Sequence, residues 1–478
     1  MLKYIEMDYK LPDLTCARKR TREDVNRRVF NIEEKLLSIG KDKYYLIKTH
    51  GCQANERDSE NIAGLLEKIG YTKTLDESKA DIVIINTCAI REGAEDKVFG
   101  ELGALKRYKT LNPNMIIGIC GCMAQEERTV KTILDKYKQV NLIFGTHNIN
   151  DLPRLISNIY EENRKSIEVY SIEGEVIEDI PSVRTSSHKA SVNIMYGCNK
   201  FCAYCIVPYT RGKERSRLLE DVVKEVEELV NNGYKEVTLL GQNVNAYGKD
   251  LDADYDFSDL LEAVAKTNIK RIRFMTSHPW DFNDKMIEVI KNNSNIMPYI
   301  HLPLQSGSDN VLKVMNRRYT SQTYKELFDK LKTNLPNFAF TTDIIVAFPG
   351  ESEEDFNKTL EMVDYCKYDN AFTFIFSPRE GTPAYNMENL IPQEEKNRRL
   401  SVLNEKVSYY ANLNNKKYQD KIVEVLVDGP SKKNPNIYSG YIPEGKLVNF
   451  KGKCNVGDIV KVKITEALSF SLNGEQVE

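Results

Sequence analysis

The chain has 478 residues, 41% hydrophobic and 29% charged, an ordinary soluble composition with room for about three domains. No apolar run approaches the ~20 residues of a membrane span, and residues 1–10 lack the apolar segment of a secretion signal. We therefore expect no membrane association. The formal net charge of −3 excludes a globally basic surface, so contacts with nucleic acid must come from local patches. Ten cysteines without a signal segment favour a reducing, cytoplasmic compartment, where clustered thiols are more often metal ligands than disulfides.

Residues 1–42 are polar and lack strong periodicity, and we expect a poorly anchored extension with one helix near residues 32–39. Residues 43–160 alternate short apolar runs with helical stretches, which predicts a doubly wound α/β domain. Three of the predicted strands end in a cysteine: Cys52, Cys88 and Cys122. Because sites in open α/β sheets gather at the carboxyl ends of the strands, we expect these three thiols to converge.

Cys120 offers an alternative to Cys122, because the two lie close together in Gly118-Ile119-Cys120-Gly121-Cys122. Cys120 is still inside the predicted strand, whereas Cys122 is in the turn after it. We favour Cys122 for the converging trio and expect Cys120 to be a buried core thiol. Scattered buried cysteines are the alternative interpretation of the whole trio.

Residues 184–415 repeat the alternation in six strand–helix units. Six units are too few for a closed eight-stranded barrel and predict a partial, open (β/α)6 barrel with its catalytic face at the carboxyl ends of the strands. Polar turns follow the strands on that face, including residues 241–245, 276–279 and 305–308. Their agreement around one rim indicates a site there.

The loop after the first of these strands carries Cys198, Cys202 and Cys205 in the spacing C-x3-C-x2-C. A structural zinc site is closed by four protein ligands, and this loop supplies only three thiolates. Three cysteines can instead hold a [4Fe–4S] cluster and leave one iron open to a substrate or cofactor. A partial zinc knuckle, or buried cysteines that happen to be close, are the alternatives.

Residues 417–478 switch to a period of two, with turn residues between the runs, which predicts a small antiparallel β-barrel. Its lysines are candidate phosphate contacts, with Tyr438 and Phe450 as candidate stacking faces for bases. These lysines are Lys432, Lys433, Lys446, Lys451, Lys453, Lys461 and Lys463. A plain solvated barrel is the alternative. Two further basic runs are candidate contacts for RNA. We take the first, Arg18-Lys19-Arg20 with Arg22, Arg27 and Arg28, as a solvated face. The second consists of Arg211, Lys213, Arg215 and Arg217.

The motifs together resemble one family, the radical S-adenosylmethionine (SAM) methylthiotransferases. The resemblance rests on His50-Gly51-Cys52-Gln53, Asn86-Thr87-Cys88, Gly121-Cys122-Met123 and the block from Asn193 to Arg217, and it runs from about residue 43 to the end. The C-terminal module is similar to the family's TRAM domain. Residues 89–95, 241–245 and 276–279 are most similar to the members that act on N6-dimethylallyladenosine in tRNA.

The resemblance implies two [4Fe–4S] clusters. Cys198, Cys202 and Cys205 would hold the cluster that binds SAM and yields a 5′-deoxyadenosyl radical, and Cys52, Cys88 and Cys122 the cluster that supplies sulfur. Gln242, Asn243 and Gln305 are candidate contacts to SAM or substrate on the rim.

The implied reaction places a methylthio group on C2 of the adenosine next to the anticodon, which requires a tRNA anticodon loop and an electron-donor protein as partners. We expect a monomer. The alternatives are the same reaction on threonylcarbamoyl-adenosine, and a non-catalytic RNA-binding protein with two structural metal sites.

Overall fold

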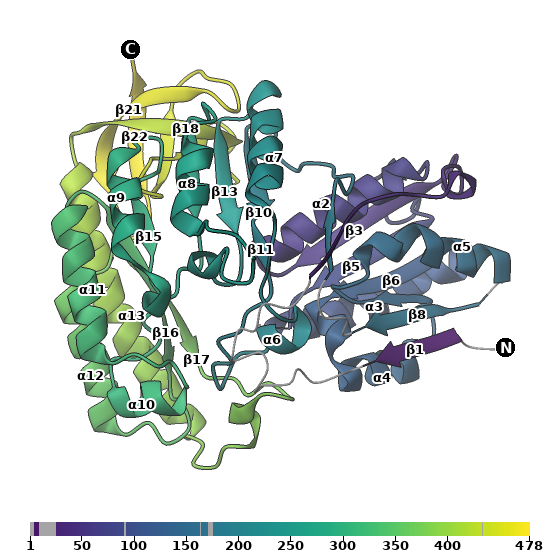
Figure 1. The fold of residues 1–478 in the computed structure, drawn as a ribbon, viewed down its shortest axis with the longest axis horizontal. Helices are drawn as coiled ribbons and strands as arrows, with labels where there is room; N and C mark the ends of the chain where they lie inside the picture. The colour runs from purple at the N-terminus through teal and green to yellow at the C-terminus, as the bar shows by residue number, and fades with distance from the viewer. Residues whose placement is uncertain (1–3, 9–24, 90–91, 163, 171–174, 433) are drawn as a thin grey trace.

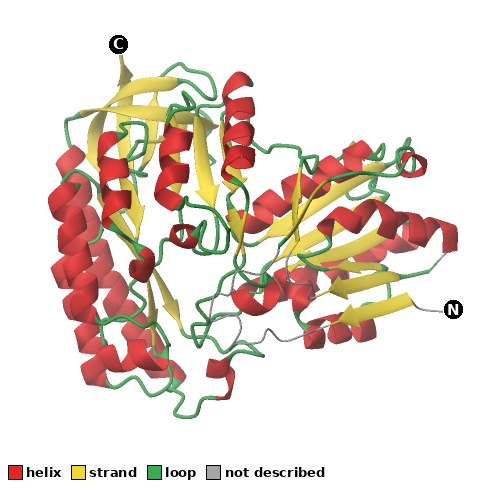
Figure 2. Ribbon diagram, viewed as in Figure 1, coloured by secondary structure: helices red, strands yellow, loops and turns green. Residues whose placement is uncertain are grey.

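The computed structural model describes residues 4–8, 25–89, 92–162, 164–170, 175–432 and 434–478. An N-terminal α/β domain lies beside a larger central domain, and a small barrel formed by the end of the chain packs on the central domain (Figure 1). In Figure 2 the strands of the N-terminal domain form an inner layer with helices on both sides. The predicted fold class, with its three kinds of domain, is confirmed.

The N-terminal domain is built on a parallel sheet of seven strands in the order β1-β8-β7-β6-β5-β3-β4. These are β1 (Tyr4–Asp8), β3 (Tyr44–His50), β4 (Thr72–Lys73), β5 (Ile82–Thr87), β6 (Ile116–Gly121), β7 (Leu142–Phe144) and β8 (Ser166–Tyr170). Helices α2 (Gln53–Lys68) and α5 (Leu152–Glu162) bury their apolar side chains on one face. Helices α3 (Glu92–Leu111) and α4 (Glu127–Lys136) do so on the other face. Because both faces are covered, the central strands β5, β6 and β7 are buried along their whole length and are mostly apolar.

The expectation of a poorly anchored N-terminal extension is wrong for its described parts. Strand β1 pairs in parallel with β8, and β2 (Asn26–Val29) pairs in parallel with β9 (Glu175–Glu178). The expected helix near residues 32–39 is only a single turn, η1 (Glu34–Leu36). A short edge strand is held by backbone hydrogen bonds and needs no apolar periodicity, so its sequence pattern is weak.

The central domain is a partial barrel made of two parallel sheets of three strands each. One contains β10 (Lys189–Asn193), β13 (Glu236–Leu240) and β14 (Arg271–Phe274), and the other β15 (Tyr299–His301), β16 (Ala339–Val346) and β17 (Asn370–Ile375). The backbone of Ile272, which bonds to Asn295 and Met297, connects the two sheets.

Helices cover the outside of the partial barrel and bury one apolar cluster against the strands. They are α7 (Leu219–Asn231), α8 (Phe257–Ala265), α9 (Asp284–Asn292), α11 (Ser321–Asn334), α12 (Glu353–Cys366) and α13 (Gln393–Asn415), with the short α10 (Asp309–Val314) at one end. None of the helices in the described ranges combines the length and apolar character that crossing a membrane requires.

The C-terminal module is a closed barrel in the order β18-β19-β20-β22-β21. Its strands are β18 (Ile422–Pro430), β19 (Tyr438–Tyr441), β20 (Leu447–Lys451), β21 (Ile459–Ala467) and β22 (Leu472–Val477). Neighbouring strands are antiparallel except β20 and β22. Arg271 and Arg273, at the start of β14, donate to backbone oxygens of Tyr441, Ile442 and Pro443. The barrel therefore closes the end of the central domain opposite the carboxyl ends of the strands.

A network of ion pairs joins the N-terminal and central domains around Glu225 of α7. Its carboxylate lies 2.5 Å from Arg217, 2.6 Å from Arg184 and 3.3 Å from Arg57 of α2. Burial alone would raise the pKa of Glu225, but the three positive charges outweigh it and lower the pKa to about 2. The folded protein thus favours the charged carboxylate.

Replacing Glu225 with glutamine should lower the midpoint of thermal unfolding at pH 7. A carboxyl with a depressed pKa stabilises the fold above its ordinary pKa of 4.5, and this contribution is lost as the pH falls towards 2. Lowering the pKa from 4.5 to about 2 corresponds to about 3 kcal/mol at neutral pH. The difference between Glu225→Gln and wild type should therefore shrink between pH 5 and pH 3 in scanning calorimetry. The exposed Glu227→Gln is the control, and an equal deficit at pH 7 and pH 3 would contradict the assignment.

Candidate active site

Cys52, Cys88 and Cys122 follow the carboxyl ends of β3, β5 and β6, three strands that are neighbours in the sheet. The structure brings the three thiols together, with Cys88 hydrogen-bonded to both of the others. These hydrogen bonds raise the pKa of Cys88, lower that of Cys52 to about 5 and lower that of Cys122 to about 7. Cys52 also caps the N-terminus of α2, where helix N–H groups favour a thiolate.

Gly121 explains why Cys122 and not Cys120 reaches this trio. Its φ of 90° turns the chain at the end of β6, and a Cβ there would lie 2.4 Å from Asn86 Oδ1 and Thr87 O. The turn places Cys122 beside Cys88, whereas Cys120 stays in the strand and packs in the apolar cluster under α2 and α5. This placement favours Cys122, and its role as a ligand stays a prediction.

The second trio lies in the loop after β10 and β11 (Met195–Tyr196), where Cys198 and Cys202 are buried and Cys205 is partly buried. A Cβ at Gly197 would lie 2.0 Å from Lys213 O, so only glycine fits there, and its φ is 72°. Phe201 also has a positive φ, of 48°. The loop is therefore tightly folded, as a wrapping around a bound group requires.

Backbone and side-chain bonds from the segment after α10 hold this cysteine loop. Met315 O accepts from Ala203 N at 2.9 Å, and Asn316 Nδ2 donates to Phe201 O at 2.9 Å. Buried Arg317 donates to Cys202 Sγ at 3.4 Å. Burial raises the pKa of Cys205 to about 12, so this thiol needs a bound cation to stay deprotonated.

The two trios lie at one junction between the domains. Ile206, next to Cys205 in the chain, packs in one buried cluster with Cys122 and Ala89. Arg211, after helix α6 (Val207–Thr210), reaches into the N-terminal domain and pairs with Asp58 of α2 at 2.7 Å. The charge of Arg211 also lowers the pKa values of Cys52 and Cys122. A residue of the central domain thus acts on the thiols of the other domain.

The rim residues Gln242, Asn243 and Gln305 follow the strands as expected, but they serve different purposes. The side-chain oxygen of Gln242 accepts from Gly197 N at 2.6 Å, so it holds the cysteine loop. Asn243 Oδ1, Gln305 Oε1 and Ser277 Oγ are buried and have no hydrogen-bond partner among the described residues. Three such oxygens fit a polar ligand, because an unmet buried polar atom is costly.

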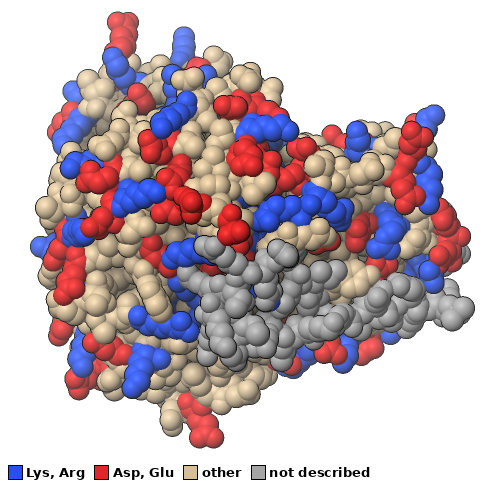
Figure 3. All heavy atoms as spheres, in the orientation of Figure 1, with Lys and Arg blue, Asp and Glu red and all other residues tan. Residues whose placement is uncertain are grey.

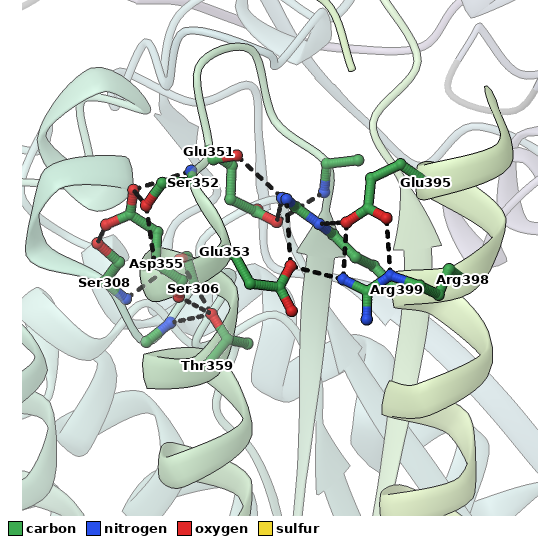
Figure 4. Close-up of polar contacts among 12 residues, drawn as sticks. Ser306, Ser308, Glu351, Ser352, Glu353, Asp355, Thr359, Glu395, Arg398 and Arg399 are labelled. Carbon is green, nitrogen blue, oxygen red and sulfur yellow. Dashed lines mark hydrogen bonds and ion pairs between the residues drawn. The ribbon is translucent and has the colours of Figure 1, made fainter. Parts of the chain in front are cut away.

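Non-glycine residues with positive φ recur at this rim, at Thr276 (63°), Gln305 (68°) and Ala347 (58°). They follow β14, β15 and β16, so backbone strain gathers at the carboxyl ends of the strands. Figure 4 shows the polar network that supports two of these turns. Asp355 of α12 accepts from Ser308 at 2.5 Å and from Ser352 at 2.7 Å, and Arg399 of α13 pairs with Glu351 at 2.7 Å.

The expectation that Arg211, Lys213, Arg215 and Arg217 form an RNA patch is wrong for its three arginines. All three are buried at the domain junction, where Arg211 pairs with Asp58 and Arg217 with Glu178 and Glu225. Arg317 and the buried Lys200–Asp281 pair (2.5 Å) were not expected near the cysteine loop. Lys200 lies between Cys198 and Cys202, and that position is the one signal that could have singled it out.

Two candidates in the C-terminal barrel are also corrected. Phe450 is in the barrel core and is not a stacking face, and Lys446 is buried in an ion pair with Asp369 at 2.8 Å. Lys432, Lys451, Lys453, Lys461 and Lys463 are exposed, whereas Arg18, Lys19, Arg20, Arg22 and Lys433 lie outside the described residues. On the face seen in Figure 3, acidic and basic side chains are interspersed.

Comparison with known proteins assigns each part of this architecture. Residues 192–363 match the radical SAM superfamily, residues 44–145 match an uncharacterized protein family, UPF0004, and residues 416–477 match the TRAM domain. Over 100% of this chain and 94% of its own length, a tRNA-2-methylthio-N(6)-dimethylallyladenosine synthase of Bacillus cytotoxicus is 53% identical. A protein of the same name from Staphylococcus haemolyticus is 52% identical over 99% of this chain and 92% of its own length.

Solved structures share the fold at low identity. The radical SAM methyltransferase TsrM from Kitasatospora setae, with tryptophan and a SAM analogue bound, aligns with a TM-score of 0.54 and 13% identity over 72% of this chain and 75% of that chain. The cobalamin-dependent radical SAM enzyme OxsB aligns with a TM-score of 0.51 and 12% identity over 78% of this chain and 56% of that chain. These likenesses support the fold alone.

The partial barrel, its cysteine loop and the two flanking domains define an enzyme of the radical SAM methylthiotransferase class. Within this class, the chain belongs to the family of tRNA-2-methylthio-N(6)-dimethylallyladenosine synthases.

The donor atoms fit the groups that this family implies. Each trio supplies three thiols, and an iron–sulfur cube is ordinarily held by thiolates, each of which binds a different iron. Buried oxygens without partners at the rim fit the polar groups of SAM. The donor atoms present therefore fit the cluster and the SAM that the family implies.

If each trio holds one cube, as the family resemblance implies, replacing Cys198, Cys202 and Cys205 with alanine should lower the iron content of anaerobically purified protein from about eight to about four per chain. Replacing Cys52, Cys88 and Cys122 should have the same effect. Cys120→Ala is the matched control and should keep all the iron. Zinc alone in the wild-type protein would refute both sites, and loss of a cluster in Cys120→Ala would move the ligand to that residue.

Proposed function

We propose that the protein transfers a methylthio group to C2 of N6-dimethylallyladenosine next to the anticodon of a tRNA. The observation that carries this proposal is the meeting of two three-thiol sites at one domain junction, where Cys122 packs against Ile206 beside Cys205. A reaction that inserts sulfur by a radical route needs both sites at one substrate. Relatives that are 53% and 52% identical carry this activity in their names.

The target C2–H bond is unactivated, and no side-chain base removes such a hydrogen at neutral pH. When bound at Cys198, Cys202 and Cys205, a [4Fe–4S] cluster with SAM supplies radical chemistry strong enough for it. The residues of the chain position these groups. Arg317 neutralises charge at Cys202, and the buried oxygens of Asn243 and Gln305 orient polar groups of SAM or substrate.

In this proposal Cys52, Cys88 and Cys122 would hold a second cluster, whose chemistry would be to supply the sulfur. The low pKa values of Cys52 and Cys122 favour thiolate ligands, and Arg211 balances their negative charge within the junction. We place the central and C-terminal domains at 184–415 and 417–478. The N-terminal domain extends beyond the expected bounds of 43–160, because β1 and β8 complete its sheet. The proposal includes a cytoplasmic monomer that takes electrons from a donor protein.

The C-terminal barrel supports RNA binding through exposed lysines on β20, β21 and their loops. Lys461 and Lys463 alternate with the buried Val462 and Ile464, so their ammonium groups share the outer face of β21. Such lysines suit phosphate contacts, which position an RNA without reading its sequence. An adenine in a single-stranded anticodon loop can leave its stack at low cost and enter the central domain.

The purified enzyme should methylthiolate an anticodon stem-loop that carries dimethylallyladenosine, and not one that carries unmodified adenosine. Mass spectrometry of three RNAs with dimethylallyl, threonylcarbamoyl or unmodified adenosine reads the product at C2. Preference for the threonylcarbamoyl RNA would favour the related activity instead. The variant without Cys52, Cys88 and Cys122 should still cleave SAM and install no sulfur. Methylthiolation by this variant at normal rates would contradict the assigned division of labour.

Replacing Lys451, Lys453, Lys461 and Lys463 with glutamine should weaken tRNA binding and leave the iron content unchanged. The plot of log Kd against log salt should become shallower by roughly 0.7–0.9 for each phosphate that the variant no longer neutralises. Four exposed lysines on or at the ends of helices of the central domain, Lys266, Lys291, Lys313 and Lys330, provide the charge-matched control. An unchanged slope in the barrel variant would show that this surface does not bind RNA.

A further inference from the structure

Strand β17 is the last strand of its sheet and forms one edge of the opening in the partial barrel. Its alternate side chains face opposite ways. Ala371 and Ile375 pack with the core that lies under the outer helices. Phe372 and Phe374 point to the other side and are 45% and 41% exposed. We call these two side chains the aromatic wall.

The aromatic wall faces the inside of the partial barrel. Phe372 packs edge-on against His301 at 5.9 Å, and His301 hydrogen-bonds to Thr341 and Asp343 on the inner face of β16. Phe374 pairs in register with Ile345 of β16. Ile345 packs against the cluster that contains Ala203 and Tyr204 of the cysteine loop. The wall therefore runs from beside the cysteine loop into the barrel.

The opposite side of the same interior is polar. Ser191, Thr238 and Arg273, from β10, β13 and β14, line a cavity of about 400 Å³ that also touches Gln53, the residue after Cys52. The inner side chains of the first sheet at this cavity are therefore polar, whereas those of the aromatic wall on β17 are apolar. Half-exposed phenylalanines in the middle of a strand are costly in water and indicate an apolar occupant.

We propose that the aromatic wall binds the five-carbon dimethylallyl substituent of the target adenosine and sets the preference for it. This inference rests on the proposed function. The substituent is a branched hydrocarbon that buries its surface against the two rings, whereas an unmodified adenosine leaves the rings exposed to water. A threonylcarbamoyl substituent would lose the hydration of its carboxylate against the same rings. One methylene in an apolar pocket already discriminates by about tenfold or more.

The test measures binding rather than turnover, using the full-length protein with reconstituted clusters. Two fluorescein-labelled anticodon stem-loops, identical except for dimethylallyladenosine or adenosine, are titrated by fluorescence anisotropy. The double variant Phe372→Ala/Phe374→Ala should lose about tenfold of the preference for the dimethylallyl RNA, with unchanged affinity for the unmodified RNA. The double leucine variant keeps apolar surface and should retain most of the preference. Tyr409→Ala, 64% exposed on α13, is the control and should match wild type.

Two results would overturn the assignment: an unchanged affinity ratio in the double alanine variant, or equal affinity of the wild-type protein for both RNAs. Neither result tests the proposed function, which is read separately as methylthiolation of the dimethylallyl RNA by wild-type enzyme. If the wild type modifies that RNA and the alanine variant keeps its preference, only the aromatic wall fails. If the wild type modifies neither RNA, the proposed function is wrong, and the assignment of the dimethylallyl group to the aromatic wall is wrong with it.

Discussion

The contact between α6 and the turn that carries Cys122 fixes the geometry on which the chemistry depends. It seats Ile206 against Cys122 and Ala89, and it carries Arg211 across the junction to Asp58. Both charges of this ion pair are buried, so removing either partner would leave the other buried and unpaired, at a cost of about 3–5 kcal/mol. Separating the domains would also expose the apolar surface around Ile206. The two thiol sites therefore keep one relative position, and a single substrate can reach both.

Turns and polar contacts elsewhere in the central domain support that junction. Strained turns at Thr276, Gln305 and Ala347 present polar groups at the carboxyl ends of the strands, and the network around Asp355 and Arg399 holds two of them in place. Strain of this kind persists only where the surroundings fix the conformation. The C-terminal barrel closes the opposite end through Arg271 and Arg273, which leaves the carboxyl ends free for substrate.

Local signals in the sequence predicted the strands and both thiol trios, because apolar runs and cysteines at strand ends are properties of a few adjacent residues. The glycine at position 121 marks a turn after the strand, so the same local reasoning could favour Cys122 over Cys120. The arginines after the cysteine loop were wrongly predicted to form an RNA patch, because the sequence shows their charge but not their partners. Asp58, for example, lies 153 residues before Arg211. Phe450 was misjudged for a similar reason, because closure of the barrel decides which side of β20 is inside.

Strand β1 has a consequence for how the protein is made. Tyr4 pairs with Ser166, so the first described strand of the chain completes its sheet only after all the other strands of that sheet have left the ribosome. Until then β1 has no partner strand in the sheet, and unpaired strand edges recruit other chains. Synthesis of this domain therefore passes through a stage that is prone to aggregation. That stage ends when β1 pairs with β8 and completes the sheet.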